Sequence, residues 1–318
     1  MSAIITDQIR ILNAKNFVAG VANTDNSYYS FIGLPNPEDY QTNWDTDPPT
    51  PKDSFDEEMG YWDSMIAMKK VNNADIRQVV TKRVWKSGTK YDMYRHDYSR
   101  SNTSSISKAT NLYNASYYVI NEDYRVYMCL QNGTSPDYPN GQISLDQPTF
   151  TDLEPRAAGT SNDGYVWKYL YTIKPNEIIK FETSDFIPVP QEWSISPDNA
   201  PVRENAVEGS IKIVTVTNSG INVGAISTSY TRVPINGDGN GAEATVVVNN
   251  DLKIDSVTVS SQGSGYTYGT LDLAAGGVPV SSTEPEFNVI IPPSGGHGAD
   301  IYRELGAYNV LMYSRLEN

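Results

Sequence analysis

The carboxylates and histidines of the chain are the side chains that could carry out chemistry. One carboxylate cluster consists of Asp53, Asp56, Glu57 and Glu58. Paired carboxylates are the catalytic groups of glycoside hydrolases. Ser54 and Glu57, however, have the spacing of a helix capping box, and negative charge is favoured at the start of a helix. Helix capping explains the cluster without a substrate, and it is the interpretation that we prefer.

The two histidines, His96 and His297, do not form a recognisable catalytic group. Asp97 follows His96 and could orient its imidazole as in a catalytic triad. No Gly-x-Ser-x-Gly motif is present to supply the nucleophile on a strained turn. His297 lies in a glycine-rich turn. We therefore expect both histidines to be surface residues or hydrogen-bonded structural residues.

Motifs for metals and cofactors are also absent from the sequence. Residues 236–241 imitate the first half of a calcium loop, but Val247 occupies the position of the bidentate glutamate and no helices flank the segment. The segment is expected to be a glycine-rich turn. Cys129 lies in an alternating strand pattern, where a small buried hydrophobe is expected. Since the sequence also lacks a P-loop, a dinucleotide fingerprint and zinc spacing, we predict no enzyme activity, catalytic residue, cofactor or metal.

An aromatic stripe follows the turn signal Asp163-Gly164. Its members occupy alternate positions: Tyr165, Trp167, Tyr169, Tyr171 and Ile173. On a β-strand, residues with period two project from the same face, so the pattern predicts that all five side chains share one face. Tyrosine and tryptophan combine a large apolar area with a polar tip. Such a face is typical of a sugar platform, a nucleic-acid stacking surface or a protein contact.

Charge and composition reduce the number of possible partners for this aromatic face. The formal net charge is −14, with 38 acidic and 24 basic residues, which disfavours binding to nucleic acid and to anionic membranes. One cysteine excludes an intrachain disulfide and fits a reducing compartment. The N-terminus lacks the features of a signal peptide, and no apolar run approaches the roughly 18 residues that span a bilayer. We expect a soluble protein that is made in the cytoplasm.

Length and composition predict an α+β chain that is predominantly β. A chain of 318 residues is expected to form two or three domains. Its 22 Tyr, 23 Gly and 19 Pro residues favour small antiparallel sheets, a few short helices and long loops. We predict an N-terminal α+β segment over 1–75 and a central β-rich domain over 76–200. Residues 201–318 are expected to form a glycine-rich β-domain.

Two helices are expected in the N-terminal segment. A helix over 54–70 is indicated by apolar residues at intervals of four, three and four. These residues are Phe55, Met59, Trp62 and Ile66. Lys69 and Lys70 would lie in its last turn, where cations are favoured. A shorter helix around residues 9–17 precedes a strand-like run at 28–32.

The remaining segments read as β-strands. Residues 76–85 are rich in branched side chains, and a hairpin is expected between 117–120 and 124–130. Residues 308–313 form another strand-like run that is expected to return to a sheet.

A weak internal duplication is visible in the glycine-rich region. Strand-like residues 214–217 parallel 257–260, and residues 239–242 parallel 296–299. Because two copies are too few for a solenoid, we interpret the region as a small β-domain built from two similar halves.

Residues 163–170 resemble a signature of baseplate wedge proteins from contractile-tailed phages of the T-even type, in particular the dimeric wedge subunits encoded by gene 8. Five further segments resemble that family in the same order: 30–33, 61–65, 81–85, 91–94 and 126–130. The resemblance covers roughly residues 15–190. The C-terminal part looks more like marine cyanophage relatives.

The resemblance implies a structural protein of the virion tail baseplate. Members of the family form a homodimer in each wedge and bridge neighbouring wedge proteins, and the baseplate reorganises when the tail sheath contracts. The expected partners are therefore a second copy and other wedge proteins, with no nucleic acid, membrane or small-molecule substrate. The resemblance assigns packing or interface roles to six residues: Trp62, Trp85, Tyr165, Trp167, Tyr169 and Tyr171.

The alternative hypothesis is a carbohydrate-binding tail protein in which the stripe stacks on sugars. The two hypotheses differ in exposure, because a sugar platform needs solvent-facing rings and a core strand buries them. If Trp167 is buried, replacing it with alanine should cost about 3–5 kcal/mol of stability.

Overall fold

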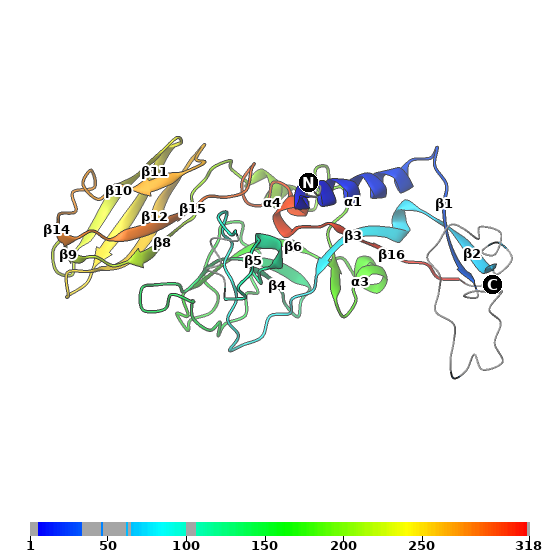
Figure 1. Ribbon diagram of the computed structural model, residues 1–318, viewed down its shortest axis with the longest axis horizontal. Coiled ribbons are helices and arrows are strands. Elements are labelled where there is room, and N and C mark those ends of the chain that lie inside the picture. Colours follow the sequence, from blue (N-terminus) through cyan, green and yellow to red (C-terminus); the bar gives the residue numbers. More distant parts are fainter. Residues whose placement is uncertain (1–5, 34–45, 47–61, 63–64, 100–105, 317–318) are drawn as a thin grey trace, which may run out of the picture.

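The computed structural model describes residues 6–33, 46, 62, 65–99 and 106–316 of the chain. The described residues form several small antiparallel sheets joined by short helices and long connections, which confirms the predicted fold class. The molecule is elongated (Figure 1). A β-rich C-terminal body lies at one end, a central sheet in the middle and a two-stranded arm at the other end.

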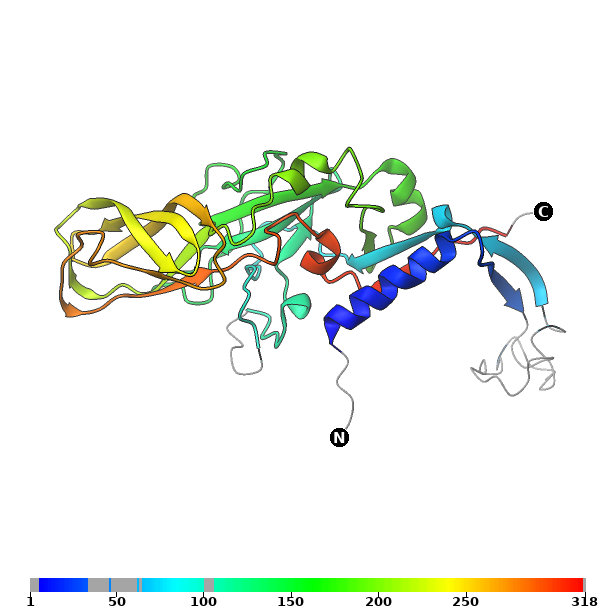
Figure 2. The ribbon, with the colours of Figure 1, turned by 90° about the horizontal axis from the view of Figure 1, so that it is seen from above.

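The N-terminal helix α1 (Asp7–Ala22) leads into the arm. Thr6 caps this helix by accepting the N–H of Ile9 at 3.4 Å. The helix expected around residues 9–17 is therefore present, and it extends further in both directions, from Asp7 to Ala22. The arm consists of β1 (Tyr28–Gly33) paired antiparallel with β2 (Met65–Val71). It extends beyond the end of α1, away from the central sheet (Figure 2).

The predicted helix over 54–70 is corrected at its C-terminal end. Residues 65–70 belong to strand β2, whereas residues 54–61, 63 and 64 lie outside the described part of the chain. Residue-by-residue pairing with β1, such as Phe31 opposite Met68, satisfies the backbone of this segment. The pairing overrides the helical spacing of the apolar residues, because local propensity is a weak determinant beside tertiary context.

A second sheet joins distant parts of the sequence. Strand β3 (Ile76–Thr81) lies between β7 (Phe186–Pro188) and β16 (Asn309–Met312), and both pairings are antiparallel. The C-terminal run thus returns to a sheet, as predicted. The 3-10 helix η2 (Asn73–Asp75) precedes β3. Helix α3 (Pro175–Phe181) packs beside β7.

The central sheet holds the aromatic stripe. Its strands are β4 (Tyr118–Ile120), β5 (Arg125–Asn132) and β6 (Tyr165–Thr172), in that order. The pairing of β4 with β5 confirms the predicted hairpin. The largest cluster of buried apolar residues surrounds this sheet. Three short helices flank it: η3 (Leu112–Asn114), α4 (Ala200–Glu204) and α5 (Ile301–Leu305).

The C-terminal body contains the remaining strands. They are β8 (Ile213–Asn218), β9 (Ile221–Val223), β10 (Ser229–Gly237), β11 (Asn240–Val248), β12 (Ile254–Ser264), β13 (Gly269–Leu271), β14 (Val280–Thr283) and β15 (Glu286–Ile290). A four-stranded sheet has the order β12-β11-β10-β13, and β15-β8 and β14-β9 form two pairs. Two clusters of buried branched residues fill this body.

The second pair of duplicated segments is not a structural repeat. Residues 239–242 cover the end of the β10–β11 turn and the first three residues of β11, whereas residues 296–299 lie in the connection before α5. Gly296 packs against Val207 so closely that a Cβ on it would meet backbone atoms at 2.4 Å. The glycines therefore serve different local purposes, namely a hairpin turn in one place and a close backbone crossing in the other.

Candidate functional site: the aromatic core and the exposed arm

The stripe begins at a turn held by Asp163. Its carboxylate accepts the N–H of Tyr165 at 3.0 Å and the N–H of Leu145 at 2.8 Å. Gly164 has a φ of 79°, a left-handed conformation that favours glycine. Asp163 and Gly164 thus set the start of β6 and tie it to the connection that precedes it in the sequence.

The first two stripe residues form the centre of the core. The rings of Tyr165 and Trp167 stack with 5.4 Å between centroids and 15° between planes, and Tyr91 meets both rings edge-on. Tyr165 and Trp167 are both 0% exposed. The Tyr165 hydroxyl donates to the carbonyl of Gln142 at 2.9 Å and accepts the N–H of Tyr91 at 2.9 Å. The indole N–H of Trp167 has no hydrogen-bond partner among the described residues.

The prediction that all stripe residues share one face is wrong. The register places Tyr169 opposite Tyr127 and Tyr171 opposite Val126, with a bulge between the two pairs. Neighbouring residues of β5 face opposite sides, so Tyr169 and Tyr171 also face opposite sides of the sheet. The Tyr169 ring packs on Tyr127, with 5.8 Å between centroids.

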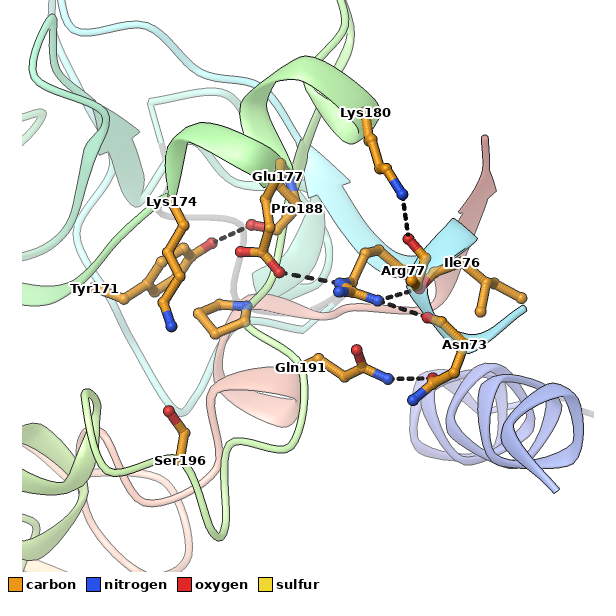
Figure 3. Close-up of polar contacts among 12 residues, drawn as sticks. Asn73, Ile76, Arg77, Tyr171, Lys174, Glu177, Lys180, Pro188, Gln191 and Ser196 are labelled. Atoms are coloured by element: carbon orange, nitrogen blue, oxygen red, sulfur yellow. Dashed lines mark hydrogen bonds and ion pairs between the residues drawn. The ribbon is translucent and has the colours of Figure 1, made fainter. Parts of the chain in front are cut away.

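On the other face, Tyr171 packs edge-on against Trp193, with 6.4 Å between centroids. The Tyr171 hydroxyl donates to the carbonyl of Pro188 at 3.1 Å (Figure 3). The stripe therefore contributes to the core on both sides of β6.

Burial excludes the sugar platform. Tyr165, Trp167 and Tyr171 are fully buried, and Tyr169 is only half-buried. A sugar would have no access to the buried rings without unfolding the core. The stripe is a packing element.

Trp85 and Trp62, the two predicted packing or interface residues outside the stripe, have contrasting environments. Trp85 packs against the central core, and its indole N–H donates to the Ser144 hydroxyl at 3.0 Å. Trp62 is 61% exposed and takes no part in the buried clusters. The structure thus brings Trp85 together with the stripe residues and leaves Trp62 at the surface.

A buried lysine lies between the stripe residues. Lys168 is 1% exposed, and its ammonium donates to the Leu153 carbonyl at 2.9 Å and to the Asn205 side-chain oxygen at 3.5 Å. Burial lowers the pKa of Lys168. Cys129 lies opposite Trp167 on the neighbouring strand β5. Its thiol is also buried, and burial raises the pKa of this thiol. The burial of Cys129 was predicted, whereas the sequence contains no signal for the burial of Lys168.

Both histidines are hydrogen-bonded structural residues, as predicted. His96 Nδ1 accepts the N–H of Ile291 at 3.2 Å, and burial lowers the pKa of this imidazole. His297 Nδ1 lies 2.6 Å from Glu304 Oε1, and its ring meets Tyr94 edge-on. The two histidines therefore join the C-terminal segment to the core.

The segment that imitates a calcium loop is a turn. The Asp238 carboxylate accepts N–H groups from Thr267 at 2.8 Å and Tyr268 at 3.3 Å. Together with the Thr267 hydroxyl, these donors lower its pKa to about 2. Across the described residues, no group of three or more His, Cys, Asp or Glu side chains is arranged to hold a metal ion.

A buried ion pair connects the sheet of β3 to helix α3. Arg77 Nε lies 3.0 Å from Glu177 Oε1, and both side chains are about one-tenth exposed. The guanidinium also donates to the carbonyl of Asn73 at 2.9 Å (Figure 3). It lies over the Phe181 ring as well. Gln191 donates to the side chain of Asn73. Sequence reasoning missed this cluster because its members are spread over more than a hundred residues.

The arm exposes large apolar side chains. We define the arm face as Tyr29, Phe31, Ile66 and Met68, which are 53%, 46%, 65% and 49% exposed. Exposed contiguous apolar surface of this kind is typical of protein interaction sites. Sequence reasoning missed the arm face because it assigned Ile66 to the buried stripe of a helix.

Comparison with known families relates the N-terminal part to a phage structural protein. Residues 3–152 match the family model Phage-Gp8, described as Bacteriophage T4, Gp8. No curated protein matches the chain. The matched residues contain the arm and Trp85 and end before the stripe. Gp8 is a structural protein of the phage tail baseplate and not an enzyme. No helix of the described residues is long and apolar enough to cross a membrane.

Proposed function

We propose that the protein is a baseplate wedge subunit that forms a homodimer and bridges neighbouring wedge proteins. The observation that carries this proposal is the match of residues 3–152 to the Gp8 family. The elongated shape supports it, because the arm and the C-terminal body lie at opposite ends of the molecule (Figure 1). A subunit of this shape can contact different neighbours at its two ends.

The distribution of aromatic residues supports a scaffold role. The stripe and its neighbours form a buried core, which gives a rigid centre. Surface aromatics such as Trp62 and Tyr29 remain available for contacts. Tyrosine, tryptophan and methionine are enriched at protein interfaces, and we propose Trp62 as an interface residue on this basis.

We propose that the subunit takes part in the rearrangement of the baseplate when the sheath contracts. Because the glycine-rich C-terminal part resembles marine cyanophage relatives, we also propose a cyanophage origin.

Sedimentation of the purified chain, alone and mixed with other wedge proteins of the same phage, tests the proposed function. We expect a dimer at micromolar concentration and a larger complex in the mixture. A chain that remains monomeric and joins no wedge protein would contradict the proposal. Binding to glycans by the folded chain in place of wedge proteins would support a carbohydrate-binding tail protein instead, with a sugar site outside the buried stripe.

A further inference from the structure

The arm face is formed by cross-strand neighbours. Tyr29 lies opposite Lys70 and Phe31 lies opposite Met68, so their side chains share one face of the two-stranded sheet. Among the described residues, β1 and β2 pair only with each other. Because a sheet of two strands is marginally stable in water, the arm is expected to gain much of its stability from a partner.

The opposite side of the arm already has a neighbour. The Ser30 hydroxyl donates to the Ser314 hydroxyl at 2.8 Å, and the Lys69 ammonium donates to the Arg315 carbonyl at 3.2 Å. The C-terminal segment thus contacts the side that carries Ser30 and Lys69. The arm face, on the other side, remains exposed.

The surface of the same chain contains an apolar groove that matches the arm face. The groove has a volume of about 540 Å³ and lies between α1 and the segment 191–195. Val18, Ala19 and Ala22 line it from the helix, and Ile195, which is 69% exposed, lines it from the opposite side. Its charged lining residues are Lys15, Glu192 and Asp300.

The arm does not reach this groove within its own chain. Figures 1 and 2 show the arm extending past the end of α1. The residues that line the groove include Lys15, Val18 and Ala22 of that helix, and no residue of β1 or β2 is among them. Both surfaces are therefore available to other molecules.

We propose that the arm face docks into this groove of a second copy of the chain, and that two copies exchange arms around a two-fold axis. This inference rests on the proposed homodimer and assigns its surface. Apolar side chains meet apolar side chains, and Lys70, which lies opposite Tyr29 on the arm face, approaches a rim that holds Glu192 and Asp300. Direct pairing of two arms is less favourable, because it would bring the lysines of both copies together.

The available area fits a stable dimer. Four half-exposed large side chains offer roughly 400 Å² on each arm face. Exchange uses the arm face and the groove of both copies, so the total is roughly 1,200 Å², the lower end of the range for standard stable interfaces. The exchange is isologous and closes on itself, so it gives a dimer and no filament.

Cysteine cross-linking between differently tagged chains tests the exchange. One chain carries Met68→Cys and the other carries Ile195→Cys, and the two are mixed and oxidised. Cys129 is fully buried and does not compete. We expect a disulfide between the two tags. The matched control pairs Met68→Cys with Ile226→Cys, a residue of the C-terminal body that is 60% exposed, and should give no product.

A charge placed on the arm face gives a second measurement. Phe31→Asp with Met68→Asp should weaken dimerisation at least tenfold, whereas Ile226→Asp should leave the dimer unchanged. A wild-type dimer that tolerates the arm substitutions and forms no cross-link between tags overturns the arm exchange and leaves the proposed dimer intact. A wild-type chain that sediments as a monomer contradicts the proposed function itself.

Discussion

Tyr169 and Tyr171 lie two positions apart in β6 but face opposite sides of the central sheet, because a bulge separates their pairings with Tyr127 and Val126. One strand therefore supplies aromatic rings to both of its faces. Tyr169 packs beside Tyr127, and Tyr171 packs beside Trp193, which comes from the connection after β7. The bulge thus allows one short sequence to hold both layers that cover the central sheet.

Trp167→Ala should reduce the free energy of unfolding by about 3–5 kcal/mol, because it leaves a cavity beside Tyr91 and Tyr165. Trp167→Phe is the matched control. It keeps a ring in the stack, and the indole N–H that it removes has no partner in the described part of the chain, so this variant should lose less stability. Urea denaturation measures both variants. An alanine variant as stable as wild type would contradict the packing role of this ring.

Arg77→Met should destabilise the protein by about 3–5 kcal/mol, because it leaves the Glu177 carboxylate buried without its cation. The double variant Arg77→Met with Glu177→Leu should regain most of this loss, since it removes both charges. Thermal and urea unfolding of the two single variants and the double variant give the coupling energy. Additive effects of the two substitutions would show that the ion pair does not act as a unit.

Lys168→Met should make the stability of the protein less dependent on pH in the alkaline range. The pKa of Lys168 is lowered by burial in the folded state, so the unfolded chain binds more protons between that lowered pKa and 10.5. The stability that Lys168 contributes to the wild-type protein therefore rises with pH across that window. The difference in melting temperature between wild type and variant, followed from pH 7 upward, should shift in favour of wild type. A constant difference would contradict the lowered pKa.

Glu154→Gln should reduce the loss of stability in acid. Partial burial favours a higher pKa for Glu154, but hydrogen bonds from Lys212, Gln262 and Asn205 outweigh it and lower the pKa from 4.5 to about 2. A lowered carboxylate pKa contributes stability above pH 4.5 that is lost as pH falls toward 2. The contacts join the segment before β6 to the C-terminal body.

Melting temperatures of wild type and Glu154→Gln between pH 6 and pH 2 measure this contribution. The wild-type advantage should shrink as the pH falls. Asp152→Asn is a suitable control, because Asp152 pairs with Arg156, four residues away in the same segment. An equal change in both variants would show that the Glu154 contacts have no special role.

The sequence alone determined the fold class and many of its elements. Strand-like patterns and turn residues predicted the hairpin of β4 and β5 and the return of the C-terminal strand, and spaced apolar residues predicted the early helix. These features depend on residues that are close in sequence, or on apolar periodicity that local geometry imposes. The composition and the missing motifs likewise predicted that the protein is not an enzyme, which agrees with the Gp8 family match.

Only the tertiary structure decided which side chains lie on which face of each sheet. Residues 65–70 have helical spacing, but pairing with β1 makes them a strand and places Ile66 and Met68 on the exposed arm face. The stripe has period two, but a bulge against β5 divides it between two faces. In both cases the deciding partner is a strand distant in sequence, and its backbone hydrogen bonds fix a register that local propensity cannot encode.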